Sequence, residues 1–172
     1  SIKPEQARWL PVLDGGALPE QSPLQTPGEW LVQKAWRERL SASLARPENR
    51  SWYAWLHYGV MLAEAFDDEG AQAAWRESIA LQPSAWAFRN LAVLHQANGR
   101  PSAALADYAA AWELVEQQSL PCEPLAHEYL GMLIQAGQHQ RAHELIAALP
   151  GPVAASERIR ISGAVAALAL DD

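Results

Sequence analysis

The hydrophobic pattern of residues 52–84 predicts two helices joined by a turn. Large apolar residues recur at spacings of three and four, first at Trp55 and Tyr58 and later around Trp75. An acidic stretch at residues 67–70 separates the two halves and is expected to form the turn. Small glycine and alanine residues between the large ones allow two helices to approach closely. The pattern therefore predicts an antiparallel helical hairpin.

The same pattern returns twice along the chain. A second copy is predicted at residues 85–118, where Gly99 and Pro101 mark an unambiguous turn between two helices. Gly59 and Ala92 hold equivalent places in the two copies, 33 residues apart. A third, looser copy is predicted at residues 124–150, after a connection lengthened by about five residues.

Helices are also predicted on both sides of these copies. One begins at Glu29 and ends at Pro47, and Asn49 or Ser51 is expected to cap the helix that follows. The last helix is expected at residues 153–170, with a stripe of Ile161, Val165 and Leu168.

This last helix has no polar outer face. Between Gly163 and Leu170 only alanine, valine and leucine occur. Three interpretations stay open: the helix packs back on the third hairpin, it meets a second copy of the chain, or it belongs to a longer array. We expect self-association through it. Because the chain begins at Ser1 without methionine, we also expect it to be part of a longer protein.

Residues 1–28 form a proline-rich segment. Five prolines fall within it, and proline removes a backbone donor and disfavours a helix interior, so the segment is expected to be irregular. Two interpretations carry equal weight. The segment is either a linker from an upstream domain or an arm that packs its apolar residues on the first hairpin. Those residues are Trp9, Leu10, Val12, Leu13 and Leu18.

The hairpin of residues 52–84 resembles a tetratricopeptide repeat (TPR). The family pattern places large apolar, small and proline residues at fixed offsets over about 34 residues. Tyrosine and leucine exchange places relative to that pattern, at Tyr58 and Leu62, and both remain large and apolar. The resemblance implies an all-α fold, a right-handed superhelix of antiparallel hairpins (a TPR-like α-solenoid) with about three repeats plus flanking helices over residues 29–172. The matching residues are Trp55, Tyr58, Gly59, Leu62, Ala71, Trp75 and Pro83.

The resemblance also implies a concave binding groove. In TPR proteins the first helix of each pair lines this groove. Some members clamp the carboxylate of a peptide tail with lysines and asparagines, but only Arg89 and Asn90 hint at such a clamp here, so none is expected. The groove residues implied are Tyr53, Leu56, Val60 and Glu64 from the first copy, Trp86, Arg89, Asn90, Val93 and Gln96 from the second, and Leu125, Glu128, Met132 and Gln135 from the third.

Composition and charge narrow the classes of partner. The 172 residues carry a net charge of −7, which argues against nucleic-acid binding because phosphate neutralisation needs a basic face. No apolar run approaches the length of a membrane span, and no signal peptide is visible. The single cysteine fits a reducing compartment, so a cytoplasmic location is expected. Abundant alanine, and arginine at 11 of 13 basic positions, suggest a bacterial source.

No residue pattern indicates catalysis. His139 and His143 have the spacing of two metal ligands on one helix face, but no third ligand is evident, and a solvated face is the better interpretation. The acidic residues 67–69 fit a helix start as well as a cation site. Neither His127 nor Cys122 has the neighbours that a zinc or nucleophile site requires. We expect no enzyme activity, no metal and no cofactor.

Two functions from different classes remain. The first is a non-catalytic scaffold that binds a protein, a peptide or a neighbouring domain through the groove. The second is a helical accessory region of a larger carbohydrate-active bacterial protein, in which exposed tryptophans stack on sugars. Residues 74–92 resemble the C-terminal repeat region of large bacterial proteins with a mutarotase-like sugar domain, and eight tryptophans in the chain suit this alternative.

Overall fold

The described part of the chain is built from α-helices. A computed structural model describes residues 4–28, 30–120 and 123–168, and no strand occurs within these ranges. The all-α class predicted from the sequence is confirmed. The helices are α1 (Pro4–Ala7), α2 (Leu10–Leu13), α3 (Lys34–Leu44), the 3₁₀ helix η1 (Pro47–Asn49), α4 (Trp52–Ala63), α5 (Asp68–Leu81), α6 (Ala85–Ala97), α7 (Pro101–Gln118), α8 (Glu123–Gln135), α9 (His139–Ala148), α10 (Gly151–Ala154) and α11 (Glu157–Leu168).

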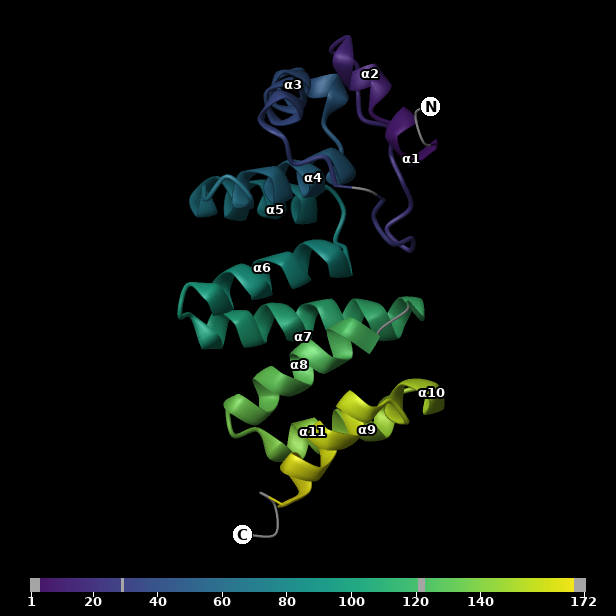
Figure 1. Cartoon of the computed structure of the whole chain (residues 1–172), viewed down its shortest axis with the longest axis vertical. Helices are drawn as coiled ribbons and strands as arrows, with labels where there is room; N and C mark the ends of the chain where they lie inside the picture. The colour runs from purple at the N-terminus through teal and green to yellow at the C-terminus, as the bar shows by residue number, and fades with distance from the viewer. Residues whose placement is uncertain (1–3, 29, 121–122, 169–172) are drawn as a thin grey trace.

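Consecutive helix pairs form the body of the molecule. Helix α4 packs on α5, α6 on α7 and α8 on α9, and neighbouring pairs meet through α5 with α6 and through α7 with α8. Figure 1 shows the pairs stacked along the long axis, with α3 near one end and α9 and α11 near the other. Each pair follows one of the hairpins predicted from the sequence, to within one residue at its start.

The turns inside the three pairs share one geometry. Each contains a residue with positive φ, and the next residue donates its backbone N–H to the carbonyl five positions earlier, which is the Schellman arrangement. The positive-φ residues are Phe66 (61°), Gly99 (66°) and Gly137 (67°). The closing bonds run from Asp67 to Leu62 (3.0 Å), from Arg100 to His95 (2.8 Å) and from Gln138 to Leu133 (2.8 Å).

The first turn comes earlier than predicted. The acidic residues 67–70 were expected to form it, but α5 already begins at Asp68. The reason is a cap: an oxygen of the Asp67 carboxylate accepts a hydrogen bond from the N–H of Gly70 at 2.9 Å. The chain reverses at Phe66 instead.

Serine caps start the first helices of two pairs. The Ser51 hydroxyl accepts from the N–H of Ala54 at 3.1 Å, and the Ser84 hydroxyl accepts from the N–H of Ala87 at 3.3 Å. Of the two residues expected to cap α4, Ser51 is the one that does so. The Asn49 amide instead donates to the carbonyls of Ser43 and Gly15.

Close packing of α4 on α5 depends on Gly59. A Cβ at this position would overlap the indole of Trp75. That indole is buried and donates from Nε1 to the carbonyl of Leu56 at 3.1 Å. The small residue therefore lets a large one cross between the helices, as the sequence pattern indicated.

The flanking helices differ from the predicted bounds. Helix α3 begins at Lys34, not at Glu29, which lies outside the described residues. Trp30 is not helical, and its ring lies 4.4 Å from the ring of His57. The predicted final helix is split into α10 and α11, with Ala155 and Ser156 between them.

The N-terminal segment packs on α3 and α4. Trp9, Val12 and Leu18 are buried, and the Trp9 ring contacts the rings of Trp36 and His57. Leu10 and Leu13 were also expected to pack, but both are exposed. The reason is the short helix α2, which turns only one side toward α3.

Helix α11 closes the stack with an apolar outer side. It packs on α8 and α9 through buried Ile159 and Ala166. The predicted stripe faces away from them: Ile161 is 60% exposed, Val165 46% and Leu168 70%. Across the described ranges no helix has both the length and the apolar character needed to cross a membrane.

Candidate functional site

Helices α4 and α6 bring several of the predicted groove residues together around one hollow. The hollow has a volume of about 270 Å³. Val60 and Glu64 reach it from α4, and Arg89, Asn90 and Val93 reach it from α6. These residues recur at spacings of three and four, which puts them on one side of each helix. Five of the predicted groove residues therefore line one hollow, together with Asp68 and Trp75 of α5.

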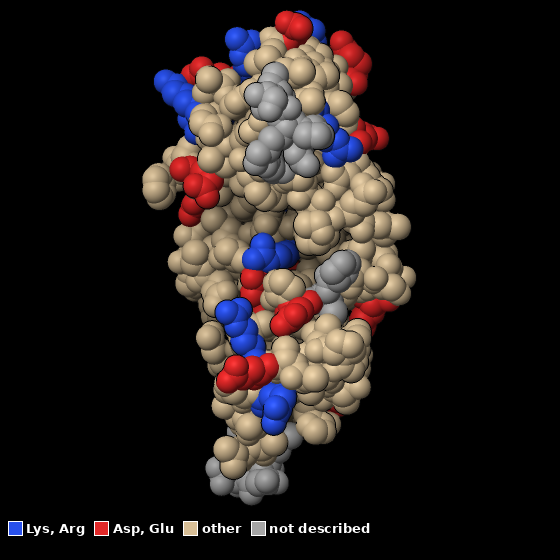
Figure 2. Space-filling model, turned by 45° about the vertical axis from the view of Figure 1, so that its right-hand side comes forward, with Lys and Arg blue, Asp and Glu red and all other residues tan. Residues whose placement is uncertain are grey.

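An ion pair joins α6 to α8 beside this hollow. The Arg89 guanidinium donates from Nε to one Glu128 carboxylate oxygen at 2.8 Å and from Nη2 to the other oxygen. The two side chains are 37% and 27% exposed. This two-pronged geometry is the strong form of an arginine–carboxylate contact. Figure 2 shows side chains of both charges lying together where this side of the molecule is hollowed.

The ion pair and burial together shift the pKa values of Arg89 and of the neighbouring Tyr108. The hydrogen bond to Glu128 raises the pKa of Arg89 further, against the opposing effect of burial. Burial, with a smaller contribution from the Glu128 charge, raises the pKa of the Tyr108 phenol to about 12. Arg89 is thus a paired cation beside a neutral phenol. Its guanidinium already pairs with a carboxylate of the chain itself.

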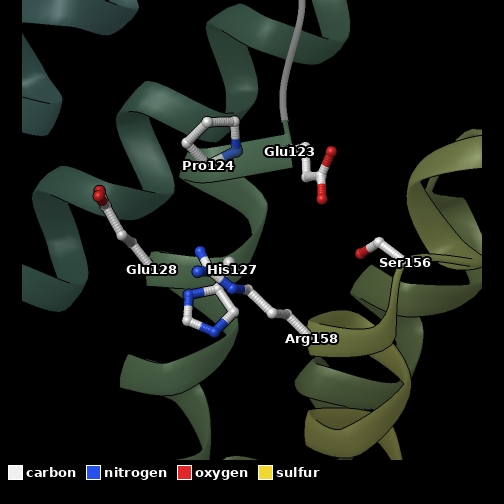
Figure 3. A pocket seen from close by; sticks show the side chains of 6 residues that line it. All are labelled: Glu123, Pro124, His127, Glu128, Ser156 and Arg158. Atoms are coloured by element: carbon white, nitrogen blue, oxygen red, sulfur yellow. The ribbon is translucent and has the colours of Figure 1, made fainter.

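A smaller hollow of about 150 Å³ lies on the other side of Glu128, between the starts of α8 and α11. Figure 3 shows Arg158 reaching from α11 toward α8, while Glu128 turns away from the space between the helices. The hydroxyl of Ser156 is buried there without a hydrogen-bond partner. No described base is hydrogen-bonded to this hydroxyl. The hollow is lined by Glu123, Pro124, His127, Glu128, Ser156 and Arg158.

Other predicted groove residues belong to the core. Leu56, Leu125 and Met132 are buried, so a ligand on the surface would not touch them. They face neighbouring helices because the first helix of each pair is covered on more than one side. Gln96 and Gln135 are exposed but lie outside the hollow that Val60 and Val93 line.

The remaining two predicted groove residues contact the chain itself. Residues 19–28, which we call the strap, lie across the starts of α4 and α6. The Trp86 indole donates to the carbonyl of Pro23 at 3.0 Å, and the Tyr53 hydroxyl accepts from the N–H of Gly28 at 3.3 Å. In Figure 1 the chain between α2 and α3 descends beside α4 toward α6. Nothing in the sequence signalled that this segment would cover the groove residues.

An aromatic cluster lies next to the strap. His57 on α4 is 1% exposed, and the rings of Trp30 and Tyr53 each lie 4.4 Å from its ring. Its Nε2 has no hydrogen-bond partner. Burial, and to a lesser extent the charge of Arg8, lowers the pKa of His57 to about 3. No sequence motif singled out His57, although its spacing of four from Tyr53 places both residues on one helix face.

Histidines and carboxylates do not gather into a metal site in the parts of the chain that are described. No group of three or more histidine, cysteine, aspartate or glutamate side chains there could hold an ion. His139 and His143 are partly or fully exposed on α9. The carboxylate of Asp68, in the acidic stretch, accepts from the Asn98 amide at 2.8 Å. Cys122 lies outside the described residues.

Comparisons with known proteins add no family to this picture. No protein-family model matches the chain, and no curated protein is significantly similar to it.

Proposed function

We propose that this chain is a non-catalytic interaction scaffold of the tetratricopeptide kind, which binds a peptide or a neighbouring domain along α4, α6 and α8. The observation that carries the proposal is the strap. A segment of this chain without regular structure already lies across the first turns of α4 and α6, held by Trp86 and Tyr53. Both bonds use backbone groups of the strap, which any peptide can supply.

The hollow between α4 and α6 gives a ligand room for side chains. Val93 is 41% exposed there and offers an apolar contact. Glu64 and Asn90 contribute polar groups to the lining. Arg89, which is ion-paired with Glu128, also lines the hollow. A mixed apolar and polar lining of this kind is typical of sites that fix a ligand by a few directed bonds.

The repeated geometry supports the superhelical part of the proposal. Three helix pairs of similar length turn through the same hydrogen-bond pattern at Phe66, Gly99 and Gly137. Pairs with the same internal turn are similar structural units, and similar units that pack one on the next tend to stack into a superhelix with a concave face.

A display experiment with the full chain tests the scaffold function. Random peptides displayed on phage are selected on the chain, and the affinities of those retained are measured by calorimetry. We expect Val93→Arg to weaken them by about tenfold or more, because it fills the hollow with a charged side chain. The matched control is Leu81→Arg, which changes a leucine of α5 that is 52% exposed. Peptides that bind both variants equally would refute the proposed face.

The alternative function concerns an accessory region of a carbohydrate-active protein. The side chain that favours it is Trp30, which is 40% exposed, because an open indole face can stack on a sugar ring. Titration of tryptophan fluorescence with oligosaccharides tests this alternative. A saturable change that Trp30→Ala removes would favour it over the scaffold.

Helix α11 supports a further contact, between two copies of the chain. Its exposed side carries Ile161, Val165 and Leu168 at helical spacing. A row of large apolar residues on one side of a helix is a typical interface feature. We include self-association through this stripe in the proposal.

A further inference from the structure

The two parts of the N-terminal segment are held in different ways. The part before the strap is anchored on α3 by side chains that donate to its carbonyls, and its own residues Trp9, Val12 and Leu18 are buried. The anchoring bonds run from Arg39 to Leu13 (2.6 Å), from Ser43 to Gly16 (2.8 Å) and from Arg46 to Gly15 (2.9 Å).

The strap is less firmly held on the helices than the part of the segment that precedes it. The bonds from Trp86 and to Tyr53 are the ones that join it to α4 and α6 among the described residues. Glu20, Ser22, Gln25 and Thr26 are exposed, and Leu24 is an exposed apolar side chain. A segment with few buried apolar contacts opens more easily than the core around it.

The two bonds specify the chemistry of what lies there. The Trp86 indole is a donor only, so it requires an acceptor, which here is a backbone carbonyl, and the Tyr53 hydroxyl here receives an N–H. Prolines at 19, 23 and 27 remove backbone donors and disfavour helix or strand. The Ser22 and Thr26 carbonyls accept bonds within the strap, while the Pro23 carbonyl accepts from Trp86. The surface therefore suits an irregular, proline-containing segment.

We infer that the surface formed by Tyr53 and Trp86 is a docking site for a proline-containing peptide of a partner, and that the strap is its intramolecular occupant. This inference rests on the proposed scaffold function. The strap and the peptide need the same indole N–H and the same hydroxyl, so they exclude each other. The anchor on α3 keeps the strap nearby after it is displaced.

Tethering makes the strap a strong competitor. A segment joined by a short linker acts at an effective concentration of about 1 mM. A peptide that binds the open surface in trans is therefore weakened when the strap is in place. Replacing residues 19–28 with glycine and serine at equal length, with the anchor unchanged, weakens the competitor, because a flexible segment without proline loses more conformational entropy when it docks.

The test uses a synthetic peptide of residues 17–28 and the side-chain N–H signal of Trp86 in NMR. We expect the peptide to shift this signal in the glycine–serine chain with an affinity at least about tenfold higher than in the intact chain. Tyr53→Phe in the glycine–serine chain removes the hydroxyl that accepts the backbone N–H, keeps the Trp86 signal as the readout, and should abolish the gain. Equal affinities in the two chains, or no shift up to about 5 mM peptide, would overturn the inference.

A second measurement needs no peptide and covers the case in which the glycine–serine chain fails to fold. In the intact chain we expect the Gly28 amide to be protected from hydrogen exchange and Tyr53→Phe to lower its protection. An unprotected Gly28 amide in the intact chain overturns the docked strap. That result also removes the observation that carries the scaffold proposal. The Val93→Arg experiment tests the hollow independently of the strap, so failure of the strap and failure of the scaffold function remain distinguishable.

Discussion

Gly59 and Gly131 hold equivalent places in the first and third helix pairs, but only Gly59 has a neighbour where a side chain would go. The Trp75 indole fills that space at Gly59, and nothing lies within 4 Å of it at Gly131. We expect Gly59→Ala to lower the free energy of unfolding by about 2 kcal/mol, because α4 and α5 must separate. Gly131→Ala should raise it by up to about 1 kcal/mol, because alanine favours the helix. Urea denaturation of both variants measures this, and equal effects would contradict it.

Phe66 adopts a backbone conformation that the corresponding turns give to glycine. Its φ is 61° and its side chain is 94% exposed, so no burial offsets the cost of the left-handed conformation. We expect Phe66→Gly to stabilise the chain by about 1 kcal/mol, because glycine adopts this conformation readily. Phe66→Ala is the control, since it removes the ring but keeps the backbone cost, and it should leave the melting temperature nearly unchanged. Destabilisation by Phe66→Gly would show that the ring makes a contact that matters.

His57 makes the stability of the fold depend on acid. Its pKa is lowered to about 3 in the folded chain, from 6.5 for the free side chain. Protons therefore bind the unfolded chain first as the pH falls below 6.5, and stability is lost progressively until the pH reaches about 3. By pH 5 the loss attributable to His57 should be about 2 kcal/mol. His57→Phe keeps a ring among Trp9, Trp30 and Tyr53 but cannot take up a proton. Urea denaturation at pH 7 and pH 5 should show a smaller loss in this variant, and equal losses would contradict the assignment.

At the scale of elements, the helix pairs could be predicted because their signals are local. The hydroxyls of Ser51 and Ser84 each cap a helix by accepting a hydrogen bond from the backbone N–H three residues later. Gly99 ends a helix because it adopts a positive φ. The late start of α3 and the covered Tyr53 could not be predicted in this way. Both depend on contacts with α4 that form only in the folded chain, such as that of Trp30 with His57. The strap is likewise held by a bond between Trp86 and Pro23, which are 63 residues apart in the sequence. Helical period alone also cannot separate groove from core, so Leu56 and Met132 were expected on the surface.

The ion pair of Arg89 and Glu128 links two helix pairs across 39 residues of sequence. The local sequence pattern places Arg89 and Glu128 each on a helix, but it does not predict the ion pair between their side chains. We expect Arg89→Ala and Glu128→Ala to be non-additive in urea denaturation, with a coupling energy of about 1 kcal/mol, because the contact is two-pronged and only partly exposed. Additive effects would show that the pair contributes nothing to the docking of α6 on α8.

For the whole molecule, charge and apolar surface act in opposite directions. The net charge of −7 keeps copies apart at long range, while the exposed stripe of Ile161, Val165 and Leu168 favours contact between copies at short range. We therefore expect light scattering to show an average mass that rises with concentration, and more steeply at high salt, because salt screens the repulsion and leaves the apolar contact. Ile161→Glu combined with Leu168→Glu should remove the rise. Leu81→Glu, an exposed leucine on α5, should not. A chain that stays monomeric at high concentration and high salt would contradict self-association through α11.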